Sequence, residues 1–174
     1  MCVARRAESP RGAPLPPALQ AAHPPPRPPP PLLAPEPAGG AAAIGHLVDQ
    51  PTPTVHVADP GSPEGAHTVY AQPRTPGFTG RPVFVLIDND TGSGAEEFAY
   101  DLQAMGRATL VGQTTWGGAT PGGYRPLAEG FVAFIPMAVV TNTITGTNWE
   151  GVGVRPDVEA PADEALDVAH RLAL

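Results

Sequence analysis

The 174-residue sequence lacks lysine altogether and has a single cysteine, Cys2. One cysteine excludes an intrachain disulfide and a cysteine-rich zinc site, and the absence of lysine excludes any mechanism in which a lysine of this chain is the base. The ten basic residues are therefore all arginines, scattered along a chain whose net charge is -7. Because a phosphate backbone is bound by clustered basic side chains, we expect no nucleic-acid partner.

Long apolar segments are also missing from the sequence. No run of about 18 apolar residues occurs, and Arg5 and Arg6 are followed by alanine and proline instead of an unbroken apolar stretch. We therefore expect a soluble chain with no membrane span and no export signal, cytoplasmic by default. No motif in the sequence implies a cofactor or a metal ion.

Proline is abundant, and it divides the chain into two parts. The N-terminal part is rich in proline and alanine, and its run Pro24–Pro31 is interrupted only by Arg27. Proline fixes φ and removes a backbone donor, so this part cannot form a packed helix or a central strand. We predict that residues 1–42 are disordered or polyproline-like and that residues 43–174 form the folded part. A ligand for an SH3- or WW-type domain is the functional alternative for the first segment.

A strand, a helix and a second strand follow one another in the C-terminal half. Val83–Ile87 is a continuous apolar run, which predicts a strand buried on both faces. After a turn at Asp88–Gly92, apolar residues recur with the spacing of one helical face up to Gly106, which is expected to end the helix. Ala108–Val111 predicts the second buried strand. This order is typical of a parallel βαβ unit, so the predicted fold class is α/β.

The other segments show less regular patterns. Thr52–Gly80 is rich in turn-forming residues and is interpreted as a long connector with extended pieces at Thr54–Val57 and Thr68–Ala71. Gly117–Gly123 is interpreted as a loop that lines or closes over a substrate, with a phosphate cradle as the alternative. Further predicted elements are a short helix within Gly39–Val48, strands at Phe131–Ile135 and Ala138–Thr141, and a helix after Pro161 with Asp163 and Glu164 in its first turn and His170 and Arg171 in its last.

Ser93 stands where the turn meets the predicted helix. A helix N-terminus presents free N–H groups and a positive dipole end, which stabilise the negative charge formed when a serine hydroxyl attacks a carbonyl. Ser93 is therefore a candidate nucleophile, and the N–H of Gly94 is a candidate oxyanion donor. The structural alternative is a capping box, because Glu96 follows Ser93 at the spacing in which both side chains only satisfy backbone donors.

Four segments of the sequence match motifs of a known family and follow one another in the same order. They are Ser93–Tyr100, Gly106–Gly112, Thr114–Gly123 and Asn148–Asp157. Together these segments resemble the tail-specific (C-terminal-processing) serine protease family, in the branch that includes interphotoreceptor retinoid-binding protein and the tricorn protease core. The resemblance is strong over residues 81–174 and weak back to about Gly45. It implies a ClpP/crotonase-like spiral of ββα units that is incomplete at its N-terminal side.

The resemblance also implies roles for individual residues. Ser93 corresponds to the nucleophile, with Gly94 in the oxyanion hole. Gly117 and Gly118 are expected to bind substrate, and Gly118 occupies the position of the lysine that many members use as the base. Members of the tricorn-like branch use a histidine base oriented by a glutamate, and Glu150 occupies the glutamate position. Their histidine comes from a segment upstream of the match, and the five histidines of this chain offer no convincing substitute.

The expected activity is that of a serine-type peptidase, which hydrolyses a peptide bond in a peptide or protein substrate through an acyl-enzyme. The base is missing from the matched segments, and Gly39–Gly40 is at most a remnant of the turn that supplies a second oxyanion donor. We therefore expect weak or no activity from this chain alone. The alternative is a non-catalytic module that binds an apolar ligand on the same scaffold. A homo-oligomer is left open, and Trp116 and Trp149 are interpreted as packing residues.

Overall fold

The structure is a computed structural model and describes residues 3–5, 39–61 and 65–174. The chain forms two compact units, Met1–Glu36 with Tyr124–Ile135, and Pro37–Gly123 with Pro136–Leu174. Most of segment 1–42, which the sequence predicts to be disordered, lies outside the described residues. Its described parts are the short strand β1, Val3–Arg5, and the beginning of helix α1 at Gly39.

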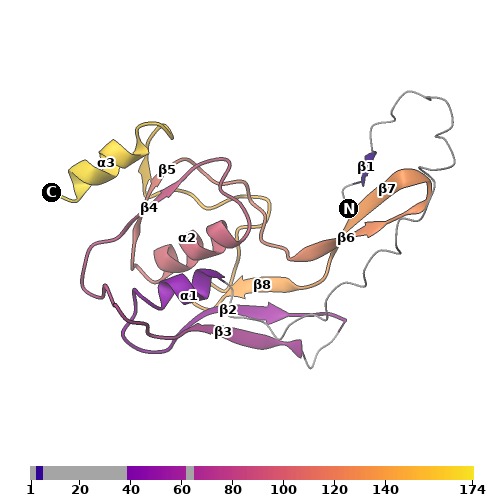
Figure 1. Cartoon of the computed structure of the whole chain (residues 1–174), viewed down its shortest axis with the longest axis horizontal. Coiled ribbons are helices and arrows are strands. Elements are labelled where there is room, and N and C mark those ends of the chain that lie inside the picture. Colours follow the sequence, from indigo (N-terminus) through magenta and orange to yellow (C-terminus); the bar gives the residue numbers. More distant parts are fainter. Residues whose placement is uncertain (1–2, 6–38, 62–64) are drawn as a thin grey trace, which may run out of the picture. The chain divides into compact units, whose positions relative to one another are not determined.

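The second unit contains the elements that build the candidate site (Figure 1). In chain order they are α1 (Gly39–Ile44), β2 (Thr52–Ala58), β3 (His67–Ala71), β4 (Phe84–Ile87), α2 (Gly94–Ala104), β5 (Thr109–Gly112), β8 (Val139–Asn142), β9 (Val158–Glu159) and α3 (Ala165–Leu172). No helix in the described ranges is long and apolar enough to cross a membrane.

The predicted strand–helix–strand unit is present. β4 and β5 pair in parallel, with Phe84 opposite Thr109 and Ile87 opposite Gly112, and α2 connects them. β9 extends this sheet in the order β4–β5–β9. Gly106 has a φ of +62°, which glycine adopts easily, and it follows the end of α2 as expected. The α/β class is confirmed.

The region Thr52–Gly80 is more than a connector. β2 and β3 form an antiparallel hairpin, and β8 pairs with the other edge of β2, so that Val55 lies opposite Asn142. The extended pieces are therefore confirmed, but the interpretation of this region as a long connector is wrong. Its turn-rich composition obscured the sheet because β2 is completed by β8, which lies far along the sequence.

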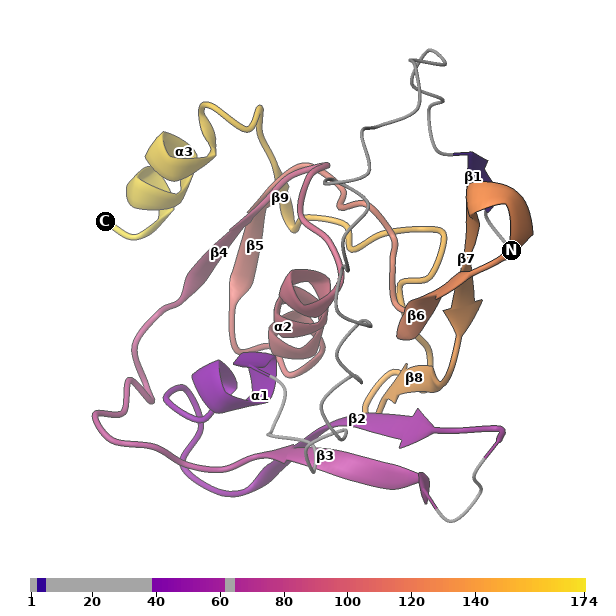
Figure 2. The same cartoon turned by 45° about the vertical axis from the view of Figure 1, so that its right-hand side comes forward.

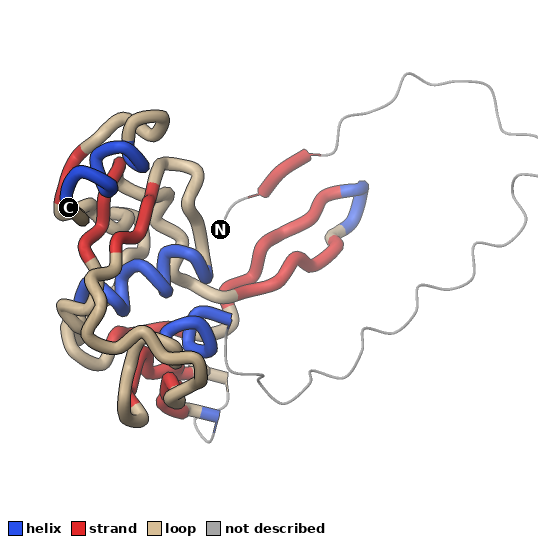
Figure 3. Tube along the Cα trace, turned by 60° about the vertical axis from the view of Figure 1, so that its left-hand side comes forward, coloured by secondary structure: helices blue, strands red, loops and turns tan. Residues whose placement is uncertain are grey.

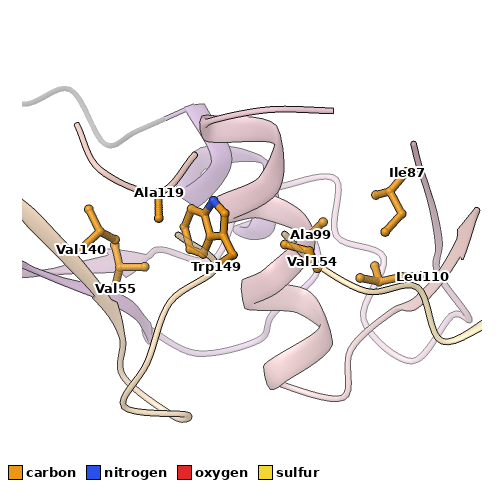
Figure 4. Close-up of a cluster of buried hydrophobic side chains, with 8 residues drawn as sticks. All are labelled: Val55, Ile87, Ala99, Leu110, Ala119, Val140, Trp149 and Val154. Atoms are coloured by element: carbon orange, nitrogen blue, oxygen red, sulfur yellow. The ribbon is translucent and has the colours of Figure 1, made fainter. Parts of the chain in front are cut away.

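Helices α1 and α2 lie between the two sheets of the second unit (Figures 1 and 2). One core cluster joins both sheets to α2, with the Trp149 ring among its side chains (Figure 4). Its members are Val55, Ile87, Ala99, Leu110, Ala119, Val140, Trp149 and Val154. A second cluster packs α1 against α2 through Ile44 and Leu102. Because α2 is packed on both sides, the position of its N-terminus is fixed.

Strand β4 is buried less completely than its apolar sequence predicts. Val85 and Ile87 face the core around α2, and Phe84 packs against residues of α3 on the opposite face. Leu86 is 43% exposed, so the prediction of burial on both faces is wrong at this residue. β4 is an edge strand, and α3 packs at its Phe84 end, which leaves Leu86 uncovered.

Helix α3 begins later than the sequence predicts. It starts at Ala165, so Asp163 and Glu164 precede it instead of occupying its first turn. His170 and Arg171 lie in its last turn as predicted, where positive charge is favoured by the helix dipole.

The first unit contains an antiparallel sheet in the order β1–β7–β6. β6 (Gly122–Pro126) and β7 (Phe131–Pro136) form a hairpin with the 3-10 helix Ala128–Gly130 at its tip (Figure 3). The strand predicted at Phe131–Ile135 is confirmed. The sequence does not predict β6, because Gly122 and Gly123 continue the glycine-rich loop and glycine is depleted in strands.

Candidate active site

Ser93 directly precedes helix α2 and is its N-cap. With a φ of 54° and a ψ of -124°, it is the only non-glycine residue with a positive φ in the described part of the chain. L-amino acids rarely adopt such a conformation, which costs on the order of 1–3 kcal/mol and is found mainly at functional sites. Ser93 is also exposed. The backbone strain therefore coincides with the candidate nucleophile.

The turn before Ser93 is held by its own side chains. Asp88 Oδ1 accepts hydrogen bonds from the N–H of Asp90 at 3.0 Å, the N–H of Thr91 at 2.9 Å and the Thr91 hydroxyl at 3.0 Å. The Thr91 carbonyl in turn accepts a hydrogen bond from the N–H of Trp116 at 3.0 Å. The turn is thus fixed internally and is joined to the loop that follows β5.

Two backbone segments approach each other beside Ser93. The Gly94 N–H is one of the amides that α2 leaves without an intrahelical acceptor, and it donates no hydrogen bond to another described residue. The first turn of α1 lies close by, since a Cβ placed on Gly40 would be 3.7 Å from the Gly94 carbonyl oxygen. The structure therefore brings Gly40, from the expected remnant of an oxyanion turn, next to Gly94.

Glu96, in the first turn of α2, is completely buried. Its Oε2 accepts hydrogen bonds from the N–H groups of Ser93, at 2.8 Å, and Gly118, at 2.9 Å. Its Oε1 accepts hydrogen bonds from the Thr115 hydroxyl, at 2.5 Å, and the Gly117 N–H, at 2.6 Å. A capping box between Ser93 and Glu96 is present, as the structural alternative expected. The same carboxylate also holds the glycine loop, so capping is only part of its role.

Glu150 holds the next two residues of the same loop. Its Oε2 accepts hydrogen bonds from the Ala119 N–H, the Thr120 N–H and the Thr120 hydroxyl, each at 2.8 Å. The hydroxyl of Thr120, together with the two N–H groups, holds the pKa of Glu150 below its usual range. Oε1 accepts no hydrogen bond from the described residues. Glu150 is exposed, so this second oxygen is free to accept a hydrogen bond from an incoming donor.

Four consecutive amides of the loop, residues 117–120, therefore donate to two carboxylates. Glu96 accepts the first two and Glu150 the last two. These amides are not available for a phosphate group, so the phosphate-cradle alternative is wrong in this conformation. The paired carboxylates instead fix the loop at one side of Ser93.

The two tryptophans have opposite environments. Trp149 is 1% exposed and is confirmed as a packing residue, but Trp116 is 72% exposed, so the packing interpretation is wrong for it. The Trp116 ring lies against backbone: a Cβ would be 3.1 Å from the ring at Gly92 and 2.9 Å at Gly118. Because Gly92 directly precedes Ser93, the exposed indole stands beside the nucleophile. Any side chain at Gly118 would require this ring to move.

Three of the four described histidines form hydrogen bonds with other residues, and the fourth, His170, lies in the last turn of α3. The hydrogen bonds join His46 Nδ1 and the Pro76 carbonyl at 2.8 Å, His56 Nδ1 and the Thr68 hydroxyl at 3.3 Å, and His67 Nδ1 and the Gly65 carbonyl at 2.8 Å. None of these four forms a hydrogen bond with Ser93, and His23 lies outside the described residues. The described part of the chain thus brings Ser93, Gly94 and the loop together without a base.

Comparison with known proteins identifies the family of the chain. The model of Peptidase family S41 matches residues 40–160. A carboxy-terminal-processing protease of Bartonella bacilliformis is 34% identical over 86 residues, which make up 48% of this chain and 20% of that protein. The chain therefore spans about a fifth of the length of this curated relative.

Solved structures share the fold. Mature CPAF, in a structure complexed with lactacystin, aligns with a TM-score of 0.59 and 15% identity over 78% of this chain and 40% of that one. The photosystem II D1 C-terminal processing protease aligns with a TM-score of 0.50 and 20% identity over 71% of this chain and 31% of that one. The family model covers well over half of the sequence and includes Ser93, Glu96 and Glu150. The chain therefore belongs to Peptidase family S41.

Proposed function

We propose that the chain is part of the catalytic domain of a serine peptidase and that Ser93 forms the acyl-enzyme. The observation that carries this proposal is the conformation of Ser93, a strained and exposed residue at a helix N-terminus. It stands beside the Gly94 N–H, which donates a hydrogen bond to none of the described residues. A cap alone does not need a positive φ, because N-cap residues normally have extended backbone. Family membership supports the same function.

In the proposed reaction, Ser93 Oγ attacks the carbonyl carbon of the scissile peptide bond while a base takes the hydroxyl proton. The Gly94 N–H donates to the resulting oxyanion, and the turn at Gly39–Gly40 supplies the second donor. The C–N bond then breaks and the leaving amine takes the proton from the base. Water hydrolyses the ester in the second half of the reaction and regenerates Ser93.

The base is proposed to be an imidazole from outside the described residues. Glu150 would orient it through Oε1, the oxygen that accepts no hydrogen bond from the described residues. Gly117 and Gly118 would line the substrate site with backbone. Residues 43–174 are assigned to the catalytic domain, whose complete architecture is proposed to be a ClpP/crotonase-like spiral.

Labelling with a fluorophosphonate tests the nucleophile directly. The chain contains only three serines, Ser9, Ser62 and Ser93, so the modified peptide identifies the reactive one. We expect the adduct on Ser93 alone, detected by mass spectrometry after digestion, because only this serine stands at the N-terminus of α2. An unmodified Ser93 after prolonged incubation would refute the proposal for this polypeptide.

Trp116 is proposed to contact the substrate, because its exposed ring lies beside Gly92. We expect a short apolar peptide to change the tryptophan emission of the chain and the Trp116→Phe variant to lose this change. Trp116→Ala should weaken peptide binding about fivefold, the loss of roughly 1 kcal/mol that one aromatic contact contributes.

The matched control is Trp149→Phe, which should keep the emission change because Trp149 is buried. A parallel titration with a fatty acid tests the apolar-ligand alternative, which nothing among the described residues favours. Saturable binding of the fatty acid without any response to peptide would reverse the order of the two functions.

A further inference from the structure

Glu96 connects two parts of the candidate site that are separate in the sequence. One of its oxygens accepts the N–H of Ser93 and of Gly118, and the other accepts the N–H of Gly117 and the hydroxyl of Thr115. The first of these donors is the amide of the nucleophile itself. The glycine donors belong to the loop that faces it across the site. One side chain therefore links the nucleophile to the loop, in addition to the hydrogen bond from the Trp116 N–H to the Thr91 carbonyl.

The network continues beyond the carboxylate. The Thr115 hydroxyl, which donates to Glu96, also accepts the N–H of Val154 at 2.7 Å. The Gly151 N–H donates to the Gly117 carbonyl at 2.8 Å. The turn that follows Glu150 is thus joined to the loop by backbone and by Thr115. Both carboxylates of the site are held in one connected set of hydrogen bonds.

The four donors around Glu96 require a carboxylate at this position. Glu96 has two oxygens that both act only as acceptors, and each meets two donors. A glutamine has one acceptor oxygen and one NH2 group, so two of the four donors would face another donor. Charge-assisted hydrogen bonds are about twice as strong as neutral ones, which suits a group that must hold a strained residue in place.

The geometry points to Glu96 as a positioning residue of the proposed peptidase. It holds Ser93 in its positive-φ conformation and holds the Gly117–Gly118 amides at a fixed distance from that residue. It acts through Ser93 and the loop and does not touch the substrate. This inference rests on the proposed function of Ser93, but the hydrogen-bond arrangement can be tested without any activity.

The experiment compares Glu96→Gln with the wild-type chain by two independent measurements. Amide hydrogen exchange, followed by NMR, should become at least about tenfold faster at Gly117 or Gly118 in the variant. The amides of Ala119 and Thr120 serve as internal controls and should stay protected, because Glu150 holds them. The fluorophosphonate labelling rate at Ser93 should fall about ten- to a hundredfold, the effect expected when a reacting group is misplaced by about 1 Å.

A second pair of variants keeps the test valid if Glu96→Gln does not fold. Thr115→Val removes one donor to Glu96, and Thr115→Ser retains the hydroxyl. We expect slower labelling in the valine variant and a wild-type rate in the serine variant, with both folded by circular dichroism.

The outcomes separate the two proposals. Wild-type labelling rates in both Glu96→Gln and Thr115→Val would overturn the positioning role while leaving the nucleophile assignment intact. Absence of labelling in the wild-type chain would instead refute the proposed function. In that case unchanged exchange at Gly117 and Gly118 would overturn the role of Glu96 as well, and accelerated exchange would support its hold on the loop.

Discussion

Replacing Ser93 by alanine is expected to abolish fluorophosphonate labelling and any peptide cleavage while changing the free energy of unfolding by only about 1 kcal/mol. The activity is lost because the substitution removes the only atom that can form the acyl-enzyme. The stability changes little because the side chain is exposed and contributes only to the cap of α2, which is worth about 1 kcal/mol. Labelling by mass spectrometry and urea denaturation measure the two effects separately.

Ser62→Ala is the matched control for this substitution, because it removes a different serine hydroxyl by the same chemical change. It should label at the wild-type rate. Retained labelling in Ser93→Ala, with the adduct on another serine, would contradict the nucleophile assignment.

Ser93→Gly separates the strain at this position from the chemistry. Glycine adopts a φ of 54° without the steric cost that serine and alanine both meet. It also replaces a serine cap with a loss of only a few tenths of a kcal/mol. The glycine variant should therefore be as inactive as the alanine variant but more stable than it by about 1 kcal/mol. Equal stability of the two variants would mean that Ser93 is not strained.

The local structure around Ser93 could be predicted from the sequence because its signals are local. Apolar residues with helical spacing predicted α2, and Gly106 predicted its end. The continuous apolar run before Asp88 predicted β4. The spacing of Ser93 and Glu96 predicted their capping box. In each case the residues that carry the pattern also form the element.

The features that could not be predicted depend on contacts between distant segments. Glu96 contacts Gly117 and Gly118 only once the loop that follows β5 has folded against the first turn of α2. The spacing of residues within the helix does not predict this contact. Trp116 is exposed because its ring lies on two glycines that offer backbone but no side chain to cover it. The β2–β3 hairpin was missed because β8 completes its sheet. The role of Glu96 could not be predicted because it depends on the burial of this carboxylate in the first turn of α2, which only the structure shows.

Asp101 provides the largest expected effect on stability, and it lies on α2 away from the nucleophile. Its side chain is 1% exposed, and its Oδ1 accepts a hydrogen bond from Asn142 Nδ2 at 2.8 Å. Oδ2 is buried and accepts no hydrogen bond from any residue that the structure describes. Burial raises the pKa of Asp101 to about 7 from 3.8, with a further contribution from the charge of Glu97 and an opposing one from the Asn142 hydrogen bond.

The sign of the pH dependence of stability follows from the raised pKa of Asp101. Below about pH 4 the carboxyl is protonated in both the folded and the unfolded chain, so it imposes no penalty. Between about pH 4 and pH 7 the unfolded chain loses this proton while the folded chain keeps it, and folding becomes less favourable as the pH rises. Above about pH 7 the contribution of Asp101 to the free energy of unfolding is constant. At 1.36 kcal/mol per pH unit, the total loss of unfolding free energy between about pH 4 and pH 7 is on the order of 4 kcal/mol.

Asp101→Asn should remove this loss, because asparagine resembles the protonated acid and does not titrate. Its oxygen can accept the Asn142 hydrogen bond, and its NH2 group takes the place of the unpartnered oxygen. We expect the stability of the variant relative to the wild type to rise by up to about 4 kcal/mol between pH 4 and pH 8. Urea denaturation of both proteins across this range measures the difference, in which most other titrating groups cancel.

Glu97→Gln is the control that isolates Asp101 from its charged neighbour. Burial also raises the pKa of Glu97, so this variant should shift the profile in the same direction. The shift should be smaller, because Glu97 is only partly buried whereas Asp101 is almost completely enclosed. Parallel stability profiles for Asp101→Asn and the wild type would show that Asp101 is already ionised in the folded chain at acid pH. The carboxylate would then need a partner for Oδ2, and α2 would have to shift from β8 to admit one.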